Sequence, residues 1–252
     1  MKTIDINCDL GELPEALADG TQEALMRLVS SANISCGGHA GDTALIRATI
    51  HQALRQGVAV GAHPGFEDPG SFGRVELPLS PDEIAASVHR QLESFGRIAT
   101  ECGALITHVK AHGALYNLAA RDRLVARAFA QGVRRWGSVV TLFGLAGSQM
   151  LQEFRSAGFA VAAEAFADRA YEPDGSLRSR KLPGALLDSA SAAAQAIRIA
   201  CDRLVISISG QSVAIDAQTI CIHGDSPGSP DLTAAVRRAL TDAGFQIAPV
   251  RP

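Results

Sequence analysis

Four histidines stand where short apolar runs of the sequence end, and each is followed within two residues by a glycine. They are His39, His63, His112 and His223. Apolar runs that end at glycine are typical of buried β-strands, so each imidazole is expected where a strand gives way to a loop. In α/β folds this edge of the sheet is where ligands bind and reactions occur. The pattern therefore predicts one polar site whose histidines exchange protons or bind a ligand.

Carboxylates stand at the same kind of position. Asp9 and Glu12 follow the first apolar run, and Asp225 lies two residues after His223, where the two side chains share a side. A carboxylate at a strand end can serve as a general base or as a metal ligand. A purely structural role for Asp9, as a loop cap, is the alternative.

Lys110 is the most unusual residue of this set. It lies two residues from His112 on an apolar run, so in a strand the two side chains point the same way. An ammonium group is costly to bury without an anionic partner. We therefore predict that Lys110 contacts either an anionic substrate or, as the alternative, a structural carboxylate.

Two arginines complete the candidate chemistry. Arg169 opens a polar segment over 165–183, and Arg74 follows Phe72-Gly73. A guanidinium group can hold a carboxylate or phosphate through two parallel hydrogen bonds. Histidine and aspartate at strand ends are also ordinary zinc or manganese ligands. The sequence has no H-E-x-x-H motif, so a divalent metal stays an open expectation.

The elements that must position these residues alternate along the chain. Strands are expected over 3–8, 31–36, 58–63, 104–110, 139–143, 159–164 and 219–222. Helices are expected over 43–57, 80–100 (with a capping box at its start and a possible break at Gly96), 121–136, 149–157, 189–201 and 229–244, and a hairpin over 204–215 turning near Gly210. This alternation over residues 1–252 predicts a single (β/α)-barrel domain, seven-stranded and distorted.

An open, doubly wound sheet is the alternative to a barrel. Such a sheet would normally carry a glycine-rich phosphate turn, and neither G-x-G-x-x-G nor G-x-x-x-x-G-K-[ST] occurs in the sequence. The formal net charge of −3 provides no positive field for nucleic acid or an anionic membrane. The five cysteines are odd in number and form no C-x-x-C pair. Reduced thiols and a cytoplasmic location are therefore expected.

Seven segments, in order through almost the whole chain, together resemble the LamB/YcsF family. They are NCDLGE at 7–12, SANISCGGHAGD at 31–42, GAHPG at 61–65, FGR at 72–74, HVKAHGALYN at 108–117, EAFADRAY at 164–171 and CIHGD at 221–225. The combination is specific although each piece alone is not. Ala111 stands where the family usually has proline, and Gly38 stands where an aromatic residue is usual.

The resemblance implies ATP-dependent opening of the lactam ring of 5-oxoproline to L-glutamate. It also implies partner subunits B and C of a 5-oxoprolinase, and a barrel related to the glycoside hydrolase/deacetylase superfamily. The residues assigned to catalysis are Asp9, His39, His63, Lys110, His112, His223 and Asp225. Those assigned to substrate binding are Asn7, Glu12, Asn33, Arg74, Glu164, Asp168 and Arg169.

The expected reaction has a clear chemical demand. A lactam is a resonance-stabilised amide, so its opening benefits from activation of the carbonyl oxygen, and phosphorylation of that oxygen creates an electrophile for water. Because the chain has no P-loop, the ATP site is expected on a partner subunit or shared with one. Two alternatives stay open: a stand-alone metal-dependent amide hydrolase or deacetylase, and a non-catalytic scaffold subunit.

Overall fold

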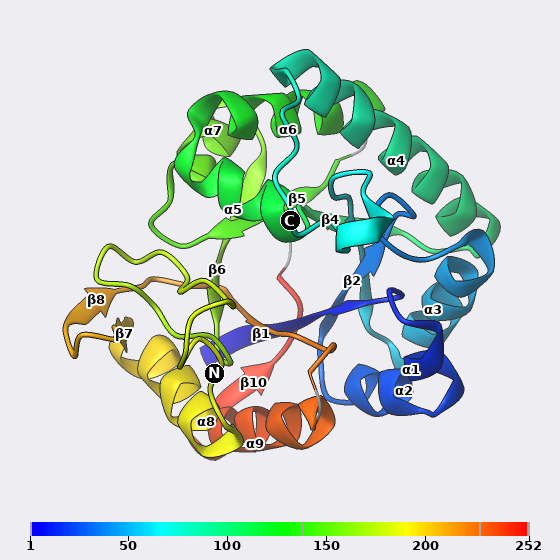
Figure 1. Ribbon diagram of the computed structural model, residues 1–252. Coiled ribbons are helices and arrows are strands. Elements are labelled where there is room, and N and C mark those ends of the chain that lie inside the picture. The colour runs from blue at the N-terminus through cyan, green and yellow to red at the C-terminus, as the bar shows by residue number, and fades with distance from the viewer. Residues whose placement is uncertain (1, 138, 227, 251–252) are drawn as a thin grey trace.

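The computed structural model describes residues 2–250 except 138 and 227. Seven parallel strands close into a barrel in the order β1-β2-β3-β4-β5-β6-β9, and β9 pairs again with β1. The predicted seven-stranded (β/α) barrel is confirmed. These strands are β1 (Lys2–Leu10), β2 (Ser31–Ser35), β3 (Ala59–His63), β4 (Ile106–Lys110), β5 (Thr141–Leu145), β6 (Ala160–Phe166) and β9 (Thr219–Ile222). Figure 1 shows them at the centre of the molecule, with helices around them.

The helices of the outer layer follow the strands in chain order. They are α1 (Pro14–Ala18), α2 (Thr21–Met26), α3 (Thr43–Gln56), α4 (Pro81–Glu101), α5 (Gly113–Arg121), α6 (Arg123–Trp136), α7 (Gln149–Ser156), α8 (Ser189–Ile197), a π-helical turn η2 (Arg198–Asp202) and α9 (Ser229–Asp242), with a 3₁₀ turn η1 (Pro69–Ser71). The capping box predicted at the start of α4 is present between Ser80 and Glu83. The break considered at Gly96 does not occur. The glycine instead admits Trp136 of α6, whose Nε1 would lie 3.0 Å from an added Cβ.

Several boundaries differ from the sequence prediction. The helix expected over 121–136 begins at Arg123, because Asp122 accepts hydrogen bonds from the backbone N–H groups of Leu124 and Val125 and so caps α6. The separate helix α5 precedes it and was not predicted. Strand β5 begins two residues later than expected, and β6 extends to Phe166.

Two small β elements lie outside the barrel order. The predicted hairpin is confirmed as β7 (Leu204–Ile206) paired antiparallel with β8 (Ser212–Ala214), and it projects from the side of the barrel in Figure 1. Strand β10 (Phe245–Ile247) was not predicted. It pairs in parallel with Lys2–Ile4 at the start of β1.

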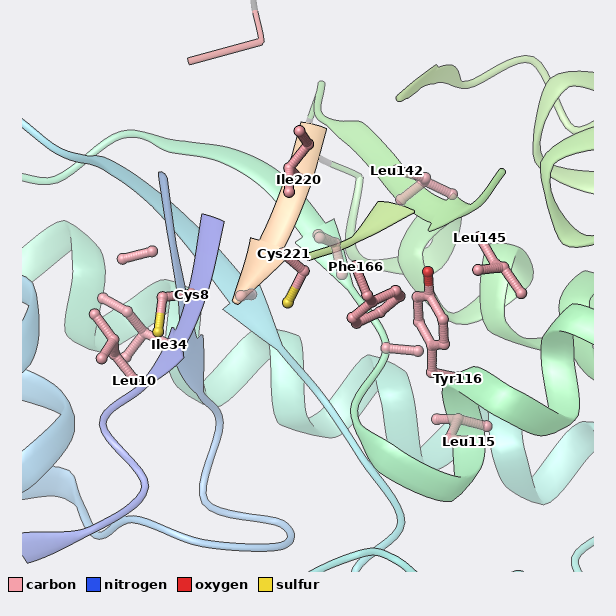
Figure 2. Packing of buried hydrophobic residues seen from close by; sticks show 14 of the residues in the cluster. Cys8, Leu10, Ile34, Leu115, Tyr116, Leu142, Leu145, Phe166, Ile220 and Cys221 are labelled. Atoms are coloured by element: carbon pink, nitrogen blue, oxygen red, sulfur yellow. The ribbon is translucent and has the colours of Figure 1, made fainter. Parts of the chain in front are cut away.

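The two faces of β1 have opposite character. Ile4, Ile6, Cys8 and Leu10 belong to the hydrophobic core beneath the helices, and Figure 2 shows Cys8 and Leu10 packed beside Ile34 of β2. The alternate residues Asp5, Asn7 and Asp9 hydrogen-bond instead to side chains from other strands of the barrel. The barrel interior is therefore a polar network, whereas most barrels of this class fill it with branched apolar side chains.

The described residues contain no helix that is both long and apolar enough to cross a membrane. All five cysteines are free thiols, three of them buried.

Candidate active site

A cavity of about 490 Å³ opens at the carboxyl ends of the barrel strands. The predicted site residues on its wall are Asp9, Glu12, His63, Arg74, Lys110, His112, Arg169, His223 and Asp225. The remaining predicted residues lie directly behind this wall and contact it: Asn7, Asn33, His39, Glu164 and Asp168. The structure thus brings together residues that the sequence spreads over more than two hundred positions.

Glycines let the loops above the strands approach closely. A Cβ on Gly73 would lie 2.8 Å from the Cβ of His39, and one on Gly113 would lie 2.6 Å from the carbonyl oxygen of Gly73. Gly113 also has a φ of +56°, which disfavours other residues. The glycine after His112 therefore lets the β3–α4 loop rest against the start of α5.

Gly38, where the family usually has an aromatic residue, lies next to a side chain that fills the space. A Cβ there would lie 2.5 Å from Oε1 of Gln91, a residue of α4. The Gln91 side chain fills this space and hydrogen-bonds both the N–H and the carbonyl oxygen of Gly65. A glutamine from a neighbouring helix thus occupies the space next to the unusual glycine.

His63 and His112 form the centre of the site, with Nε2 of His63 and Nδ1 of His112 3.0 Å apart. The other nitrogen of each ring donates to a backbone carbonyl: Nδ1 of His63 to Lys110 at 2.9 Å, and Nε2 of His112 to Phe72 at 2.9 Å. A carbonyl can only accept, so these two contacts fix which nitrogen of each neutral ring carries its proton. The two facing nitrogens are therefore the basic ones.

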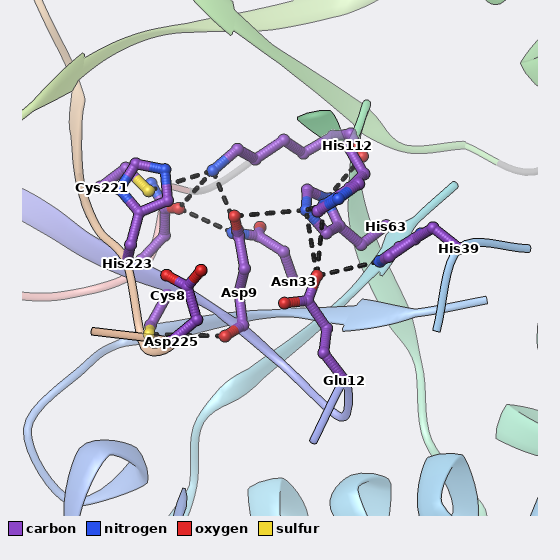
Figure 3. A network of polar contacts seen from close by, with 12 residues as sticks. Cys8, Asp9, Glu12, Asn33, His39, His63, His112, Cys221, His223 and Asp225 are labelled. Atoms are coloured by element: carbon purple, nitrogen blue, oxygen red, sulfur yellow. Dashed lines mark hydrogen bonds and ion pairs between the residues drawn. The ribbon is translucent and has the colours of Figure 1, made fainter. Parts of the chain in front are cut away.

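Two carboxylates flank these basic nitrogens (Figure 3). Oδ2 of Asp9 lies 3.3 Å from Nε2 of His63, and Oε1 of Glu12 lies 3.2 Å from Nδ1 of His112. Burial opposes protonation of His112, but the contact with Glu12 outweighs it and raises the pKa of the imidazole. Burial likewise opposes ionisation of Glu12, yet its contacts with the imidazoles of His112 and His39 hold the pKa of its carboxyl well below the usual range.

His39 supports this group from behind. Its Nε2 lies 2.9 Å from Oε1 of Glu12, and its ring stacks on that of His112 with centroids 3.6 Å apart. Burial lowers the pKa of His39 to about 4. The ring is therefore neutral at pH 7, and its Nε2–H donates to Glu12.

Lys110 is held by a complete set of partners in the barrel. Its ammonium lies 3.0 Å from Asp9 and 2.9 Å from Glu164, and it also contacts Asn7 Oδ1 and Cys221 Sγ. Burial opposes its charge, but the Asp9 and Glu164 carboxylates raise the pKa of Lys110 well above its ordinary value. An ammonium has three N–H donors. These contacts favour the structural ion pair, the second of the two roles predicted from the sequence.

His223 and Asp225 lie on the opposite side of the cavity. Nδ1 of His223 lies 2.9 Å from Oδ2 of Asp168, which orients the imidazole. Asp225 forms ion pairs with Arg74 and with Arg180, the latter at 3.1 Å. Asp225 therefore joins two arginines across the mouth of the cavity.

Five buried polar atoms in or near the wall have no hydrogen-bond partner: Tyr116 Oη, Arg169 Nε, Glu164 Oε2, Asp225 Oδ1 and His39 Nδ1. Tyr116 and Arg169 line the cavity, and only 6 % of Arg169 is exposed. Tyr116 lies within a segment on which the family resemblance rests, but nothing in the sequence predicted a role for this residue. Arg180 was not predicted as a site residue. It lies in the polar segment over 165–183, where nothing in the sequence distinguished it from a solvated charge.

Three groups of side chains have ligand atoms close enough to hold a metal ion. They are Asp9 with His63 and His112, Glu12 with His39 and His112, and Asp9 with Cys221 and His223. In the second group His39 already donates a proton to Glu12. The first group has two basic nitrogens with fixed tautomers and is the best suited of the three.

A sequence profile of the LamB/YcsF family matches residues 4–252. The A subunit of the 5-oxoprolinase of Chloroflexus aggregans is 48 % identical over 248 residues, which are 98 % of each chain. The crystal structure of a lactam utilization protein from Thermus thermophilus is 41 % identical, with a TM-score of 0.91 over 99 % of this chain and all of that one.

A more distant similarity concerns the fold alone. A family 4 carbohydrate esterase from Streptomyces lividans superimposes with a TM-score of 0.53 at 10 % identity, over all of this chain and 94 % of that one. The barrel therefore shares its fold with that esterase.

Proposed function

Since this chain belongs to the LamB/YcsF family, we propose that it is the A subunit of an ATP-dependent 5-oxoprolinase and contains the site where the lactam is opened. The observation that supports this most is the His63–His112 pair, 3.0 Å apart and flanked by Asp9 and Glu12 on the cavity wall. The names of the relatives as oxoprolinase subunits and a lactam utilization protein point the same way.

The paired histidines suit the proton transfers that lactam opening requires. Water must lose a proton as it attacks the carbonyl carbon, and the ring nitrogen must gain one as the C–N bond breaks. Two basic nitrogens 3.0 Å apart can take the first proton and deliver one to the nitrogen. Glu12 stabilises the imidazolium that forms in between, because its carboxylate is ionised and in contact with His112.

Other residues of the cavity lining are assigned to orienting the substrate. The unpartnered Nε of Arg169 and the hydroxyl of Tyr116 are buried donors beside the cavity. A buried donor without a partner costs free energy, which a ligand oxygen would recover. We assign Arg169 to the carboxylate of 5-oxoproline and Tyr116 to one of its polar atoms. His223, held by Asp168, is placed to contact the same ligand.

ATP belongs, in this proposal, to a site on partner subunits B and C or shared with them. The chain has neither of the two common phosphate-binding motifs. The designation of the relative as one subunit of an oxoprolinase is in line with such a complex. The isolated chain should therefore open the lactam weakly or not at all.

The deciding experiment measures glutamate and ADP formed from 5-oxoproline and ATP by the chain alone, by subunits B and C alone, and by all three together. We expect equal amounts of both products from the full set only. A His112→Ala variant should abolish glutamate formation, whereas His51→Ala, on the exposed face of α3, should not. ATP-independent amide hydrolysis by the chain alone would identify a stand-alone hydrolase. Unchanged activity of His112→Ala would indicate a scaffold.

A further inference from the structure

The cavity floor has more negative than positive charge. Glu12 and Glu164 are buried carboxylates, and the side chain of Asp9 is only 10 % exposed. The one fixed cation that contacts any of the three within the described part of the chain is Lys110. Buried charges persist only where they are compensated. Two further positive charges are needed beside Asp9 and Glu12, and two bound protons or one divalent cation would supply them.

The tautomers of the two histidines favour a metal cation. Each ring uses one N–H on a backbone carbonyl, so the lone pairs of His63 Nε2 and His112 Nδ1 face each other and two carboxylates. His63 Nε2, His112 Nδ1 and Asp9 Oδ2 therefore face one another with no hydrogen between them and repel, whereas Glu12 Oε1 also accepts from His39. Histidines that bind metals in proteins characteristically donate the opposite N–H to a backbone carbonyl or a carboxylate.

The distances fit a small ion. Zinc bonds to nitrogen and oxygen of about 2.0–2.1 Å in a tetrahedral arrangement place the ligand atoms about 3.3–3.4 Å apart. The separations observed are 3.0 Å between the two imidazole nitrogens and 3.3 Å between His63 Nε2 and Asp9 Oδ2. Asp9, His63 and His112 also form a group whose ligand atoms all lie within 4.8 Å of one another.

We propose that Asp9 Oδ2, His63 Nε2 and His112 Nδ1 bind one divalent transition-metal ion, with Zn²⁺ as the favoured ion, on the floor of the cavity. Two imidazoles and a carboxylate suit zinc, and three protein ligands leave a coordination position for water or substrate. A cation bound there would polarise the lactam carbonyl or lower the pKa of a bound water. Glu12, held by His39, lies beside the site with a carboxylate available to accept a proton.

This metal site adds to the proposed function. Only the reaction in which the metal takes part depends on that function; metal binding itself does not. The metal can be measured on the isolated chain without substrate, partners or ATP. Protein stripped with a chelator would be titrated with Zn²⁺ by calorimetry and with Co²⁺ by visible absorption, whose ligand-field bands report the coordination geometry. We expect one ion per chain and proton release on binding.

Conservative variants locate the site. His63→Gln and His112→Gln should each weaken Zn²⁺ binding more than about 100-fold, beyond the roughly 10- to 100-fold typical of residues that only orient ligands. His51→Gln, on the exposed face of α3, is the matched control and should bind like the wild type. Circular dichroism and the unfolding midpoint would verify that each variant is folded.

The inference is overturned if the stripped, folded wild-type chain binds no stoichiometric Zn²⁺ or Co²⁺, or if His63→Gln and His112→Gln bind as tightly as the wild type. The two histidines would then share protons with Asp9 and Glu12 instead. Full oxoprolinase activity of metal-free complex would also overturn it and leave the proposed function standing. Tight zinc binding that depends on His63, without any oxoprolinase activity, would support the metal site and contradict the proposed function.

Discussion

At the scale of single residues, the polar interior of the barrel decides what each charge can do. Lys110 is 2 % exposed and lies between Asp9 and Glu164. The sequence could predict that this lysine needs an anionic partner, because an apolar strand cannot hold an unpaired ammonium. It could not say which partner, since Asp9 and Glu164 come from strands far away in the chain.

Replacing Lys110 by methionine should destabilise the chain. Methionine keeps most of the volume of the side chain, but Asp9 and Glu164 lose their shared cation, and breaking a buried pair costs about 3–5 kcal/mol. Urea unfolding of the wild type and of Lys110→Met measures this loss, with the exposed Lys2→Met, away from the cavity, as control. An unchanged unfolding free energy with a turnover reduced about 100-fold would instead assign the ammonium to the reaction itself.

Asp5 should make stability depend on pH. Burial raises its pKa to about 6, although hydroxyls of Ser30, Thr219 and Ser31 donate to it. The folded chain therefore holds a proton that the unfolded chain releases near pH 4, so this contribution to stability is present below pH 4 and is lost as the pH rises through 6. The loss amounts to about 3 kcal/mol.

The measurement is the difference in unfolding free energy between Asp5→Asn and the wild type from pH 4 to pH 7. The difference should move in favour of the variant as the pH rises, because asparagine does not ionise. The exposed Asp242→Asn serves as control. A difference that stays constant over this range would show that Asp5 is ionised throughout.

At the scale of elements, periodicity and caps predicted most of the barrel. The capping box at Ser80 and the apolar runs before the four histidines correspond to α4 and to four of the barrel strands. What failed were features set by tertiary contacts or weak local patterns. Strand β10 forms only by pairing with β1. Helix α5 was not predicted, and a single aspartate separates it from α6, which was expected to begin at Arg121.

The contact between α4 and α6 depends on Gly132. A Cβ there would lie 2.7 Å from the carbonyl oxygen of Ala85 and 2.8 Å from Cβ of Val88, so the two helices would have to move apart. Gly132→Ala should lose about 1–3 kcal/mol of stability by overpacking, despite the better helix propensity of alanine. Gly96→Ala is the matched control, because it meets only the side chain of Trp136. Equal unfolding midpoints for the two variants would contradict this close approach.

At the scale of the whole molecule, charge is distributed unevenly. The chain has a formal net charge of −3, yet the outer part of the cavity is rich in cations. Arg74, Arg121, Arg169, Arg180 and Lys181 line it together with the carboxylates of Glu76 and Asp225. A cleft of this kind attracts anionic ligands. The sequence could not predict this distribution, because the cations come from three separate loops and helices and only the closed barrel assembles them.

Asp225 pairs with arginines on both sides of the cavity mouth, and its replacement should change substrate binding but not the rate of the chemical step. It pairs with Arg74 from the β3–α4 loop and with Arg180 from the segment after β6. Asp225→Asn keeps the shape but releases both guanidinium groups, so the rim should hold an anionic substrate in more than one orientation. We expect KM of the assembled complex for 5-oxoproline to rise about tenfold, equivalent to about 1.4 kcal/mol, with kcat nearly unchanged. Asp216→Asn, an exposed aspartate paired with Arg203, is the control. A kcat reduced by about 100-fold or more with KM unchanged would instead place the Asp225 carboxylate among the groups that act in the transition state.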